Sequence, residues 1–283
     1  MKDLESELIL IYCVCDDCLK MLNHKDDPQC KMSTAEVMTM AIASAYFFYG
    51  NFRMTPCTLL AAGFMKKVLS ESQLNRRWHA IDPEIWLAVF RILAEINKRH
   101  GVSSRYYAVD SFPMPACQKA RSSRCKLYHG KEYLGVCQSK SLQYYGLKIH
   151  IIVTESGTLY GFYFTPASRA DVKALEQHEL HLPKGSILLG DKAYTSYELE
   201  DLLQEQDGVT LLPLRKKNLT RQYEPIVKQV IQSTRKIVET TISCIQRLLP
   251  KAIVARSARG FELKILMCIL AKSCSDYWKL SAA

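Results

Sequence analysis

The sequence predicts an α/β protein in which a mixed five-stranded sheet flanked by helices follows an all-helical region. Three observations indicate this class. Apolar residues recur with helical spacing through residues 1–100, the spacing becomes strand-like after residue 101, and short apolar strands then alternate with helical segments. A length of 283 residues with 48% hydrophobic residues suffices to bury the core of one large or two smaller domains. We expect a domain boundary near residue 100.

Capping and spacing indicate the helices of the first region. Ser33 and Glu36 form a capping box, because each side chain can bond the backbone N–H of the other, and an apolar helix over 37–48 follows. Further helical periods cover residues 56–69, 72–80 and 83–99, the last of which opens with a proline.

Arg76 and Arg77 lie on the helix expected over 72–80. With Gln73 and Asn75 before them, they could belong to the reading helix of a helix-turn-helix, which would place them on DNA. Exposed arginines are also common on helices that bind nothing. Both interpretations remain open from the sequence.

The second region contains the five strands. They are expected over residues 106–109, 144–153, 158–165, 187–190 and 209–212, and helices over 170–178, 196–206, 226–249 and 260–278. Pro113 and Pro115 are expected to prevent the first strand from continuing, because proline has no N–H for a strand ladder.

The positive charge of the chain is concentrated near its end. The formal net charge is +10, and residues 210–283 hold 14 Lys and Arg against 4 Asp and Glu. Such an excess is typical of a protein that meets a polyanion, because each cation that contacts a phosphate releases condensed counterions. An anionic membrane surface is the alternative, but no uncharged stretch of about 18 apolar residues exists. Nucleic acid is therefore the better interpretation.

The cysteines do not indicate a disulfide framework. Their number, eleven, is odd, and the first residues are acidic where a signal peptide would be basic, so we expect reduced thiols and a cytoplasmic protein. Two groups could bind zinc but lack the usual paired spacing. They are Cys13, Cys15, Cys18, His24 and Cys30, and Cys117, Cys125, His129 and Cys137. We interpret His150, a lone histidine within a strand, as structural.

Two acids follow short apolar strands directly. Asp110 and Asp191 each stand where a strand ends, so each would face the crevice at the carboxyl edge of the sheet. Aspartates also cap turns after strands for purely local reasons. Taken singly, neither acid indicates a function.

A third acid, Glu239, lies on the helix expected over 226–249. Arg235 precedes it by four residues and Gln246 follows by seven, so the three share one helix face. Alone, this pattern indicates an ion pair on the helix surface. With the two aspartates, it offers the three carboxylates that two Mg²⁺ ions about 3.5 to 4 Å apart require for phosphodiester chemistry.

These acids lie in motifs that together resemble a known family. The motifs are Val109-Asp110-Ser111-Phe112-Pro113, Tyr145-Gly146-Leu147-Lys148-Ile149-His150, Gly190-Asp191-Lys192-Ala193-Tyr194, Arg235-Lys236-Ile237-Val238-Glu239-Thr240 and Ala258-Arg259-Gly260-Phe261-Glu262. The sequence resembles the ribonuclease H-like transposases of the Asp-Asp-Glu (DDE) class found in bacterial insertion sequences, specifically group nine-eight-two. The resemblance implies that Asp110, Asp191 and Glu239 are catalytic and bind two Mg²⁺ ions, with Mn²⁺ able to substitute.

The resemblance also implies partners and a place of action. A bacterial transposase would act in the cytoplasm on nucleoid DNA, bind terminal inverted repeats and target DNA as a homodimer, and join 3′-hydroxyl ends to the target. The first 100 residues would serve DNA binding and assembly, and residues 101–283 catalysis. Of the family signature on the late helix, Arg235 and Glu239 match, whereas Gln232 stands for a tyrosine and Gln246 for a lysine. Arg247 could supply the missing cation.

The remaining DNA contacts are expected from basic side chains near these motifs. The insertion at 112–143 carries Lys119, Arg121, Arg124, Lys126, Lys131 and Lys140 against one acid, and we interpret it as a flexible segment that follows a DNA backbone. The full expected set is Arg235, Arg247, Gln246, Lys216, Lys217, Lys148, Lys192, Arg121, Arg124, Arg76 and Arg77.

Two other functions fit the same residues. A nuclease or junction resolvase on this scaffold would cut DNA without joining it. A DNA-binding relative without activity would retain the fold alone. The presence of all three acids disfavours the second.

Overall fold

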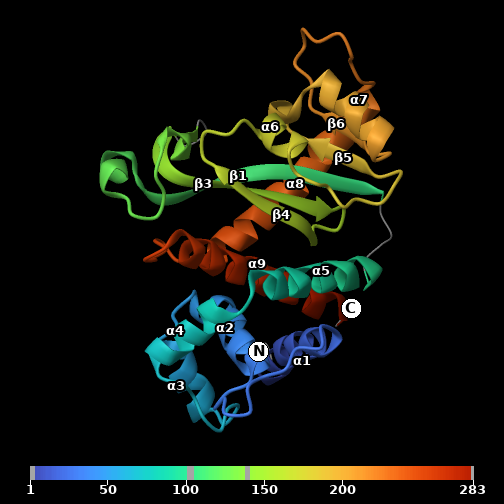
Figure 1. The fold of residues 1–283 in the computed structure, drawn as a ribbon. Helices are drawn as coiled ribbons and strands as arrows, with labels where there is room; N and C mark the ends of the chain where they lie inside the picture. The colour runs from blue at the N-terminus through green and yellow to red at the C-terminus, as the bar shows by residue number, and fades with distance from the viewer. Residues whose placement is uncertain (1–3, 101–104, 138–140, 282–283) are drawn as a thin grey trace. The chain divides into compact units, whose positions relative to one another are not determined.

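The computed structural model describes residues 4–100, 105–137 and 141–281 (Figure 1). The chain divides into two compact units. A helical unit comprises Met1–His100 and Cys244–Ala283, and a sheet unit comprises Gly101–Ser243. No helix in the described part of the chain is both long enough and apolar enough to cross a membrane.

The helical unit is built around two buried helices. Its elements are α1 (Leu4–Met21), α2 (Thr34–Phe48), α3 (Met54–Ala61), α4 (Glu71–Ala80), α5 (Pro83–His100), the end of α8 (Pro225–Leu248) and α9 (Ala258–Ser281). The capping box is confirmed: Ser33 Oγ accepts from the Glu36 N–H, and the Glu36 carboxylate accepts from the Ser33 N–H. Because α2 is apolar on nearly every side, it is buried between α1 and α9.

Helix α3 is shorter than the sequence indicated. The helix expected over 56–69 ends at Ala61, because Gly63 adopts a left-handed conformation with φ of 78°. The Phe64 N–H then bonds the Leu59 carbonyl, and the Gly63 N–H bonds the Leu60 carbonyl. These two hydrogen bonds form a Schellman motif, whose left-handed residue is usually glycine.

Residues 244–283 group with the N-terminal helices, although the sequence assigned them to the same domain as the sheet. The reason is the burial of α9, whose apolar side chains face α2 and α5. Phe261, Ile265, Ile269 and Leu270 are fully buried there.

The sheet unit contains the predicted mixed sheet with flanking helices. Its strands are β1 (Tyr106–Gln118), β2 (Leu134–Cys137), β3 (Leu142–Thr154), β4 (Leu159–Pro166), β5 (Ile187–Gly190) and β6 (Thr210–Pro213). Their order is β2-β3-β1-β5-β6, with β4 also paired to β3. Strands β1, β5 and β6 run parallel, and β3 is antiparallel to β1, β2 and β4. Helices α6 (Asp171–Glu176), α7 (Tyr197–Gln206) and most of α8 complete the unit.

Strand β1 does not stop at the prolines, contrary to the expectation. Pro113 and Pro115 lie within it, opposite Lys148 and Gly146 of β3. Beyond Val109, β1 has β3 as its one described partner, since its pairing with β5 ends there. A proline fits such an edge wherever its nitrogen faces the unpaired side.

The basic segment 112–143 is folded rather than flexible in its described part. Strand β1 continues to Gln118, two short 3₁₀ turns follow (Lys119–Arg124 and Lys131–Tyr133), and β2 adds a sixth strand (Figure 1). The Tyr128 and Tyr133 rings stack with centroids 4.6 Å apart, and the Tyr145 hydroxyl donates to the carbonyls of Tyr128 and Gly130. These aromatic contacts hold the segment against β3. Lys140 lies outside the described residues.

Candidate active site

The register between β1 and β5 brings the two aspartates together. The parallel pairing aligns Tyr106–Val109 with Ile187–Gly190, residue by residue. Asp191 therefore follows the last residue of β5, and Asp110 lies beside it as the first residue of β1 beyond the pairing with β5. The expectation that a strand ends at Asp110 was wrong, because β1 continues along β3 to Gln118. The strands are rigid here, because Val109, Leu188 and Leu189 are buried in the core. Open sheets bind ligands at the carboxyl ends of parallel strands, where β5 ends here.

Asp110 is half-buried and carries a perturbed carboxyl group. The Ser111 N–H donates to Asp110 Oδ1 at 2.8 Å. Burial raises the pKa of Asp110 to about 6, the Ser111 N–H and Arg235 oppose that rise, and the charges of Asp191 and Asp171 add to it. A carboxyl with a raised pKa gains more from a nearby cation than one in water does.

Asp191 begins the 3₁₀ turn Lys192–Tyr194 that follows β5. Its Oδ1 accepts from the Lys192 N–H at 2.6 Å, and its side chain is 33% exposed. The turn is fixed by Tyr194, whose ring is fully buried in the core beside β5. The local capping role that the sequence allowed for Asp191 is thus real, and it leaves the other carboxylate oxygen available.

The third acid, Glu239, is connected to Asp191 by Arg235. On α8, Arg235 Nη2 lies 3.1 Å from Glu239 Oε1, and Arg235 Nη1 lies 3.4 Å from Asp191 Oδ1. Arg235 Nε is buried and has no hydrogen-bond partner among the described residues. Arg235 therefore links Glu239 to Asp191, and its positive charge also acts on Asp110.

The position of α8 in the sheet unit is set by the turn between β3 and β4. Thr241 Oγ1 donates to the Gly157 carbonyl at 2.9 Å, and a Cβ on Gly157 would lie 3.1 Å from Ile237 Cγ2. Gly157 also has φ of 80°. A larger residue at 157 would push the helix away, so this glycine allows the close approach that positions Glu239.

A fourth acid, Asp171, lies beside this group, although no motif in the sequence pointed to it. It is the first residue of α6, where a negative charge interacts favourably with the helix dipole whether or not the acid has another role. Ser111 Oγ donates to its Oδ1 at 3.2 Å, and Lys148 Nζ donates to the same oxygen at 2.8 Å. The fold brings Asp171 near Asp110, and nothing in the sequence around either residue indicated this.

Lys148 was expected to contact DNA, and the structure gives it protein partners. Its side chain is 20% exposed, pairs with Asp171 and donates to the Arg169 carbonyl at 2.8 Å. His150, two residues further along β3, is fully buried. Its ring nitrogens lie 3.2 Å from the Tyr194 hydroxyl and 3.0 Å from Thr165 Oγ1, as the structural interpretation predicted.

The residue types at the three acids fit a divalent cation. Carboxylate oxygens are the ligands that Mg²⁺ prefers, and no histidine or cysteine is required. In the part of the chain that the structure describes, no three Asp, Glu, His or Cys side chains are grouped closely enough to hold one ion, the cysteine groups included. Arg235 lies between Asp191 and Glu239 instead. Each of these two ion pairs is partly exposed and worth at most about 1 kcal/mol, so a divalent cation could displace the arginine.

Most other predicted DNA contacts are exposed. This holds for Lys192, Lys216, Lys217, Arg121, Arg124, Arg76 and Arg247, whereas Gln246 is half-buried. Gln246 and Arg247 belong to the helical unit. Arg77 differs, because its guanidinium contacts Cys30 Sγ and lies 3.6 Å from Asp26 Oδ1.

One basic residue near the predicted set has a purely internal role. Arg215, which precedes Lys216 and Lys217, forms a bidentate ion pair with Glu200 and is nearly fully buried. Its guanidinium also lies over the Tyr197 and Tyr223 rings. The segment that carries the two exposed lysines is therefore fixed at Arg215.

Comparison with known proteins identifies a family. Residues 100–250 match a family model described as Transposase DDE domain, a span that includes Asp110, Asp191, Arg235 and Glu239. No curated protein matches the chain.

Proposed function

The chain belongs to the family of transposase DDE domains, and from that membership we propose that it cleaves phosphodiester bonds at the ends of an insertion sequence and joins the freed 3′-hydroxyl ends to target DNA. The family acts in DNA transposition, which requires DNA binding and, in this class, divalent metal ions. One observation carries the proposal. Asp110 and Asp191 directly follow the residues that pair β1 with β5 in matched parallel register, and Arg235 connects Glu239 to Asp191.

Asp110, Asp191 and Glu239 are the residues that would hold the metal. Two Mg²⁺ ions, or Mn²⁺ in their place, would activate the attacking oxygen and stabilise the leaving oxygen of each displacement. The strands fix the two aspartates, and the contact of Thr241 with Gly157 fixes the turn of α8 that carries the glutamate. Lys148 holds Asp171 and thereby limits the negative charge that Asp110 meets.

Arg235 would change partners when metal binds. Without metal it neutralises Asp191 and Glu239. Once the acids bind metal, its guanidinium is free to donate to a phosphate oxygen at the same edge of the sheet, a contact for which its planar fork is suited.

The DNA would be double-stranded, comprising the terminal inverted repeats of the element and its target. Lys192 adjoins Asp191, and Lys216 and Lys217 extend from the loop after β6, so their ammonium groups suit phosphate contacts in this unit. Arg121 and Arg124 provide further cations in the folded segment after β1. We propose a homodimer on DNA, and residues 1–100 as a DNA-binding and assembly domain.

We also propose that the chain falls within insertion-sequence group nine-eight-two. Support comes from the sequence motifs around Asp110, Lys148, Asp191 and Glu239. The substitution of Gln246 for a family lysine would leave Arg247, which is exposed, as the nearest cation on α8.

A single assay separates this function from its alternatives. Purified protein is incubated with Mg²⁺ and an end-labelled duplex that carries the inverted repeats flanking the gene. Joined products support a transposase, and cleavage without joining supports a nuclease or resolvase. Binding without either product would indicate a catalytically inactive relative and contradict the proposal.

A further inference from the structure

The helical unit contains two adjoining hollows that the acid site does not use. The larger has a volume of about 550 Å³, the smaller about 180 Å³, and Gly50, Phe52, Trp78, Val254 and Lys264 line both. The walls of the larger hollow, which we call the α4–α9 cleft, come from α4, the segment 254–257 and the start of α9. With Gly50 and Phe52, three parts of the chain that are far apart in the sequence, 50–52, 71–79 and 254–264, thus form one cleft.

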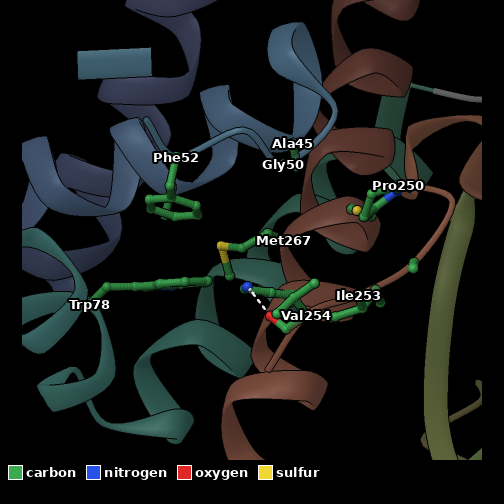
Figure 2. A pocket seen from close by; sticks show the side chains of 12 residues that line it. Ala45, Gly50, Phe52, Trp78, Pro250, Ile253, Val254 and Met267 are labelled. Atoms are coloured by element: carbon green, nitrogen blue, oxygen red, sulfur yellow. Dashed lines mark hydrogen bonds between the residues drawn. The ribbon is translucent and has the colours of Figure 1, made fainter. Parts of the chain in front are cut away.

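The cleft has an apolar base. The Phe52 and Trp78 rings stack with centroids 4.3 Å apart, and Met267, which lines the smaller hollow, lies next to them (Figure 2). Val254, at the margin, is 79% exposed. Trp78 is fully buried, so the base is rigid and supplies shape rather than an open stacking surface.

The rim of the cleft is positively charged. Arg76 and Arg256 are exposed and Lys264 is half-buried, and Glu71 is the one acid among the lining residues. Within the described chain no carboxylate lies within 4.0 Å of these three cations. Lys264 Nζ donates to the Val254 carbonyl instead. Buried cations elsewhere in the chain do have acids, as Arg215 has Glu200.

The partial burial of Lys264 makes the absence of an acid beside it significant. Burial lowers the pKa of Lys264, since the charged ammonium is partly removed from water. Burial and the charges of Arg259 and Lys264 lower the pKa of His79, which lines the same cleft. Cations that line one cleft with a single acid among them favour an anionic ligand.

We propose that the α4–α9 cleft binds one strand of the DNA duplex, with backbone phosphates on Arg256, Lys264 and Arg76. The inference rests on the proposed function, because that function requires DNA. Exposed Ser72 and Asn75 of α4 line the same cleft and can hydrogen-bond phosphates or base edges. The polar face of α4 and the two cations that follow Val254 in the sequence, Arg256 and Lys264, thus form a single surface. From the sequence alone, Arg76 was expected to contact DNA, but Arg256 and Lys264 were not.

The test measures DNA affinity as a function of salt, without divalent metal, so that it does not depend on cleavage. The full chain and its R256Q/K264Q variant are titrated into a labelled duplex of arbitrary sequence. Removal of two cations that neutralise phosphates should lower the slope of log affinity against log salt by about 2 and weaken binding roughly tenfold to hundredfold at 0.1 M salt. R76Q, an exposed change, should lower the slope by about 1.

The control variant K25Q/K67Q removes the same charge from exposed lysines of the same unit that line neither hollow. Tryptophan fluorescence checks folding, because all three tryptophans lie in the helical unit. An equal fall in the control, or unchanged slopes in the cleft variants, would overturn the inference. Altered binding of an acidic peptide with DNA binding intact would instead assign the cleft to a protein and also overturn it. Loss of DNA binding in R256Q/K264Q supports the cleft even if the chain proves unable to cleave DNA.

Discussion

The buried histidine of the sheet unit makes stability depend on pH. His150 bonds the Tyr194 hydroxyl and Thr165 Oγ1, stacks on the Tyr163 ring at 4.5 Å, and is fully buried. Burial lowers its pKa from 6.5 to about 4. Between these values the unfolded chain binds a proton at His150 and the folded chain does not. The free energy of unfolding therefore falls as the pH falls through this window.

The size of the effect follows from the shift. A displacement of about 2.5 pKa units corresponds to roughly 3 kcal/mol once the pH is below 4. Between pH 7 and pH 5 the expected loss is about 2 kcal/mol, because the unfolded histidine is then almost fully protonated. In the variant His150→Gln, which keeps polar atoms but cannot titrate, this part of the pH dependence should disappear.

Hydrogen exchange of the β3 and β4 amides is the suitable assay, because tryptophan fluorescence reports only on the helical unit. Opening free energies of the wild type and H150Q are compared at pH 7 and pH 5. The comparison uses the change with pH, so a uniform loss of stability in the variant does not matter. Variant His178→Gln is the control, since His178 is half-exposed whereas His150 is fully buried. Equal pH dependence in wild type and H150Q would refute the reasoning.

Two further predictions concern charged side chains of the same unit. The double variant Lys216→Gln/Lys217→Gln should weaken DNA binding and lower its salt slope by about 1 for each phosphate that is no longer neutralised, measured by anisotropy; an unchanged slope would exclude these lysines from the interface. Lys148→Met should reduce the free energy of unfolding by roughly 2 to 3 kcal/mol, because it leaves the mostly buried Asp171 carboxylate unpaired. Adding Asp171→Asn should recover much of that loss, and strictly additive losses would show that the pair does not interact.

Much of the fold follows from short-range sequence signals. The strand 187–190 and the helix over Glu71–Ala80 were predicted almost to the residue, since a buried apolar run and a regular helical period each leave one interpretation. The continuation of β1 was missed, because a proline forbids pairing on one side of a strand only. Which side lacks a neighbour is decided by how far β5 extends.

The site was predictable where position along the chain carries the information. Asp110 and Asp191 each follow a short apolar run that is typical of a strand, and Arg235 and Glu239 are spaced for one helix face. Asp171 was not predictable, because its contact with Ser111 bridges 60 positions of sequence. Lys148 could not be recognised as an internal ion-pair partner for the same reason. The grouping of Arg256 and Lys264 with Arg76 likewise depends on α9 packing within the helical unit.

The central claim is that the three acids perform phosphodiester chemistry, and the variant Asp191→Ala tests it most directly. With the flanking inverted repeats as labelled duplex and Mg²⁺ present, this variant should bind DNA as the wild type does but neither cleave nor join it. Asp201→Ala, which removes an exposed acid paired with Arg221, is the matched control and should retain both activities. Cleavage by Asp191→Ala at the wild-type rate would contradict the assignment.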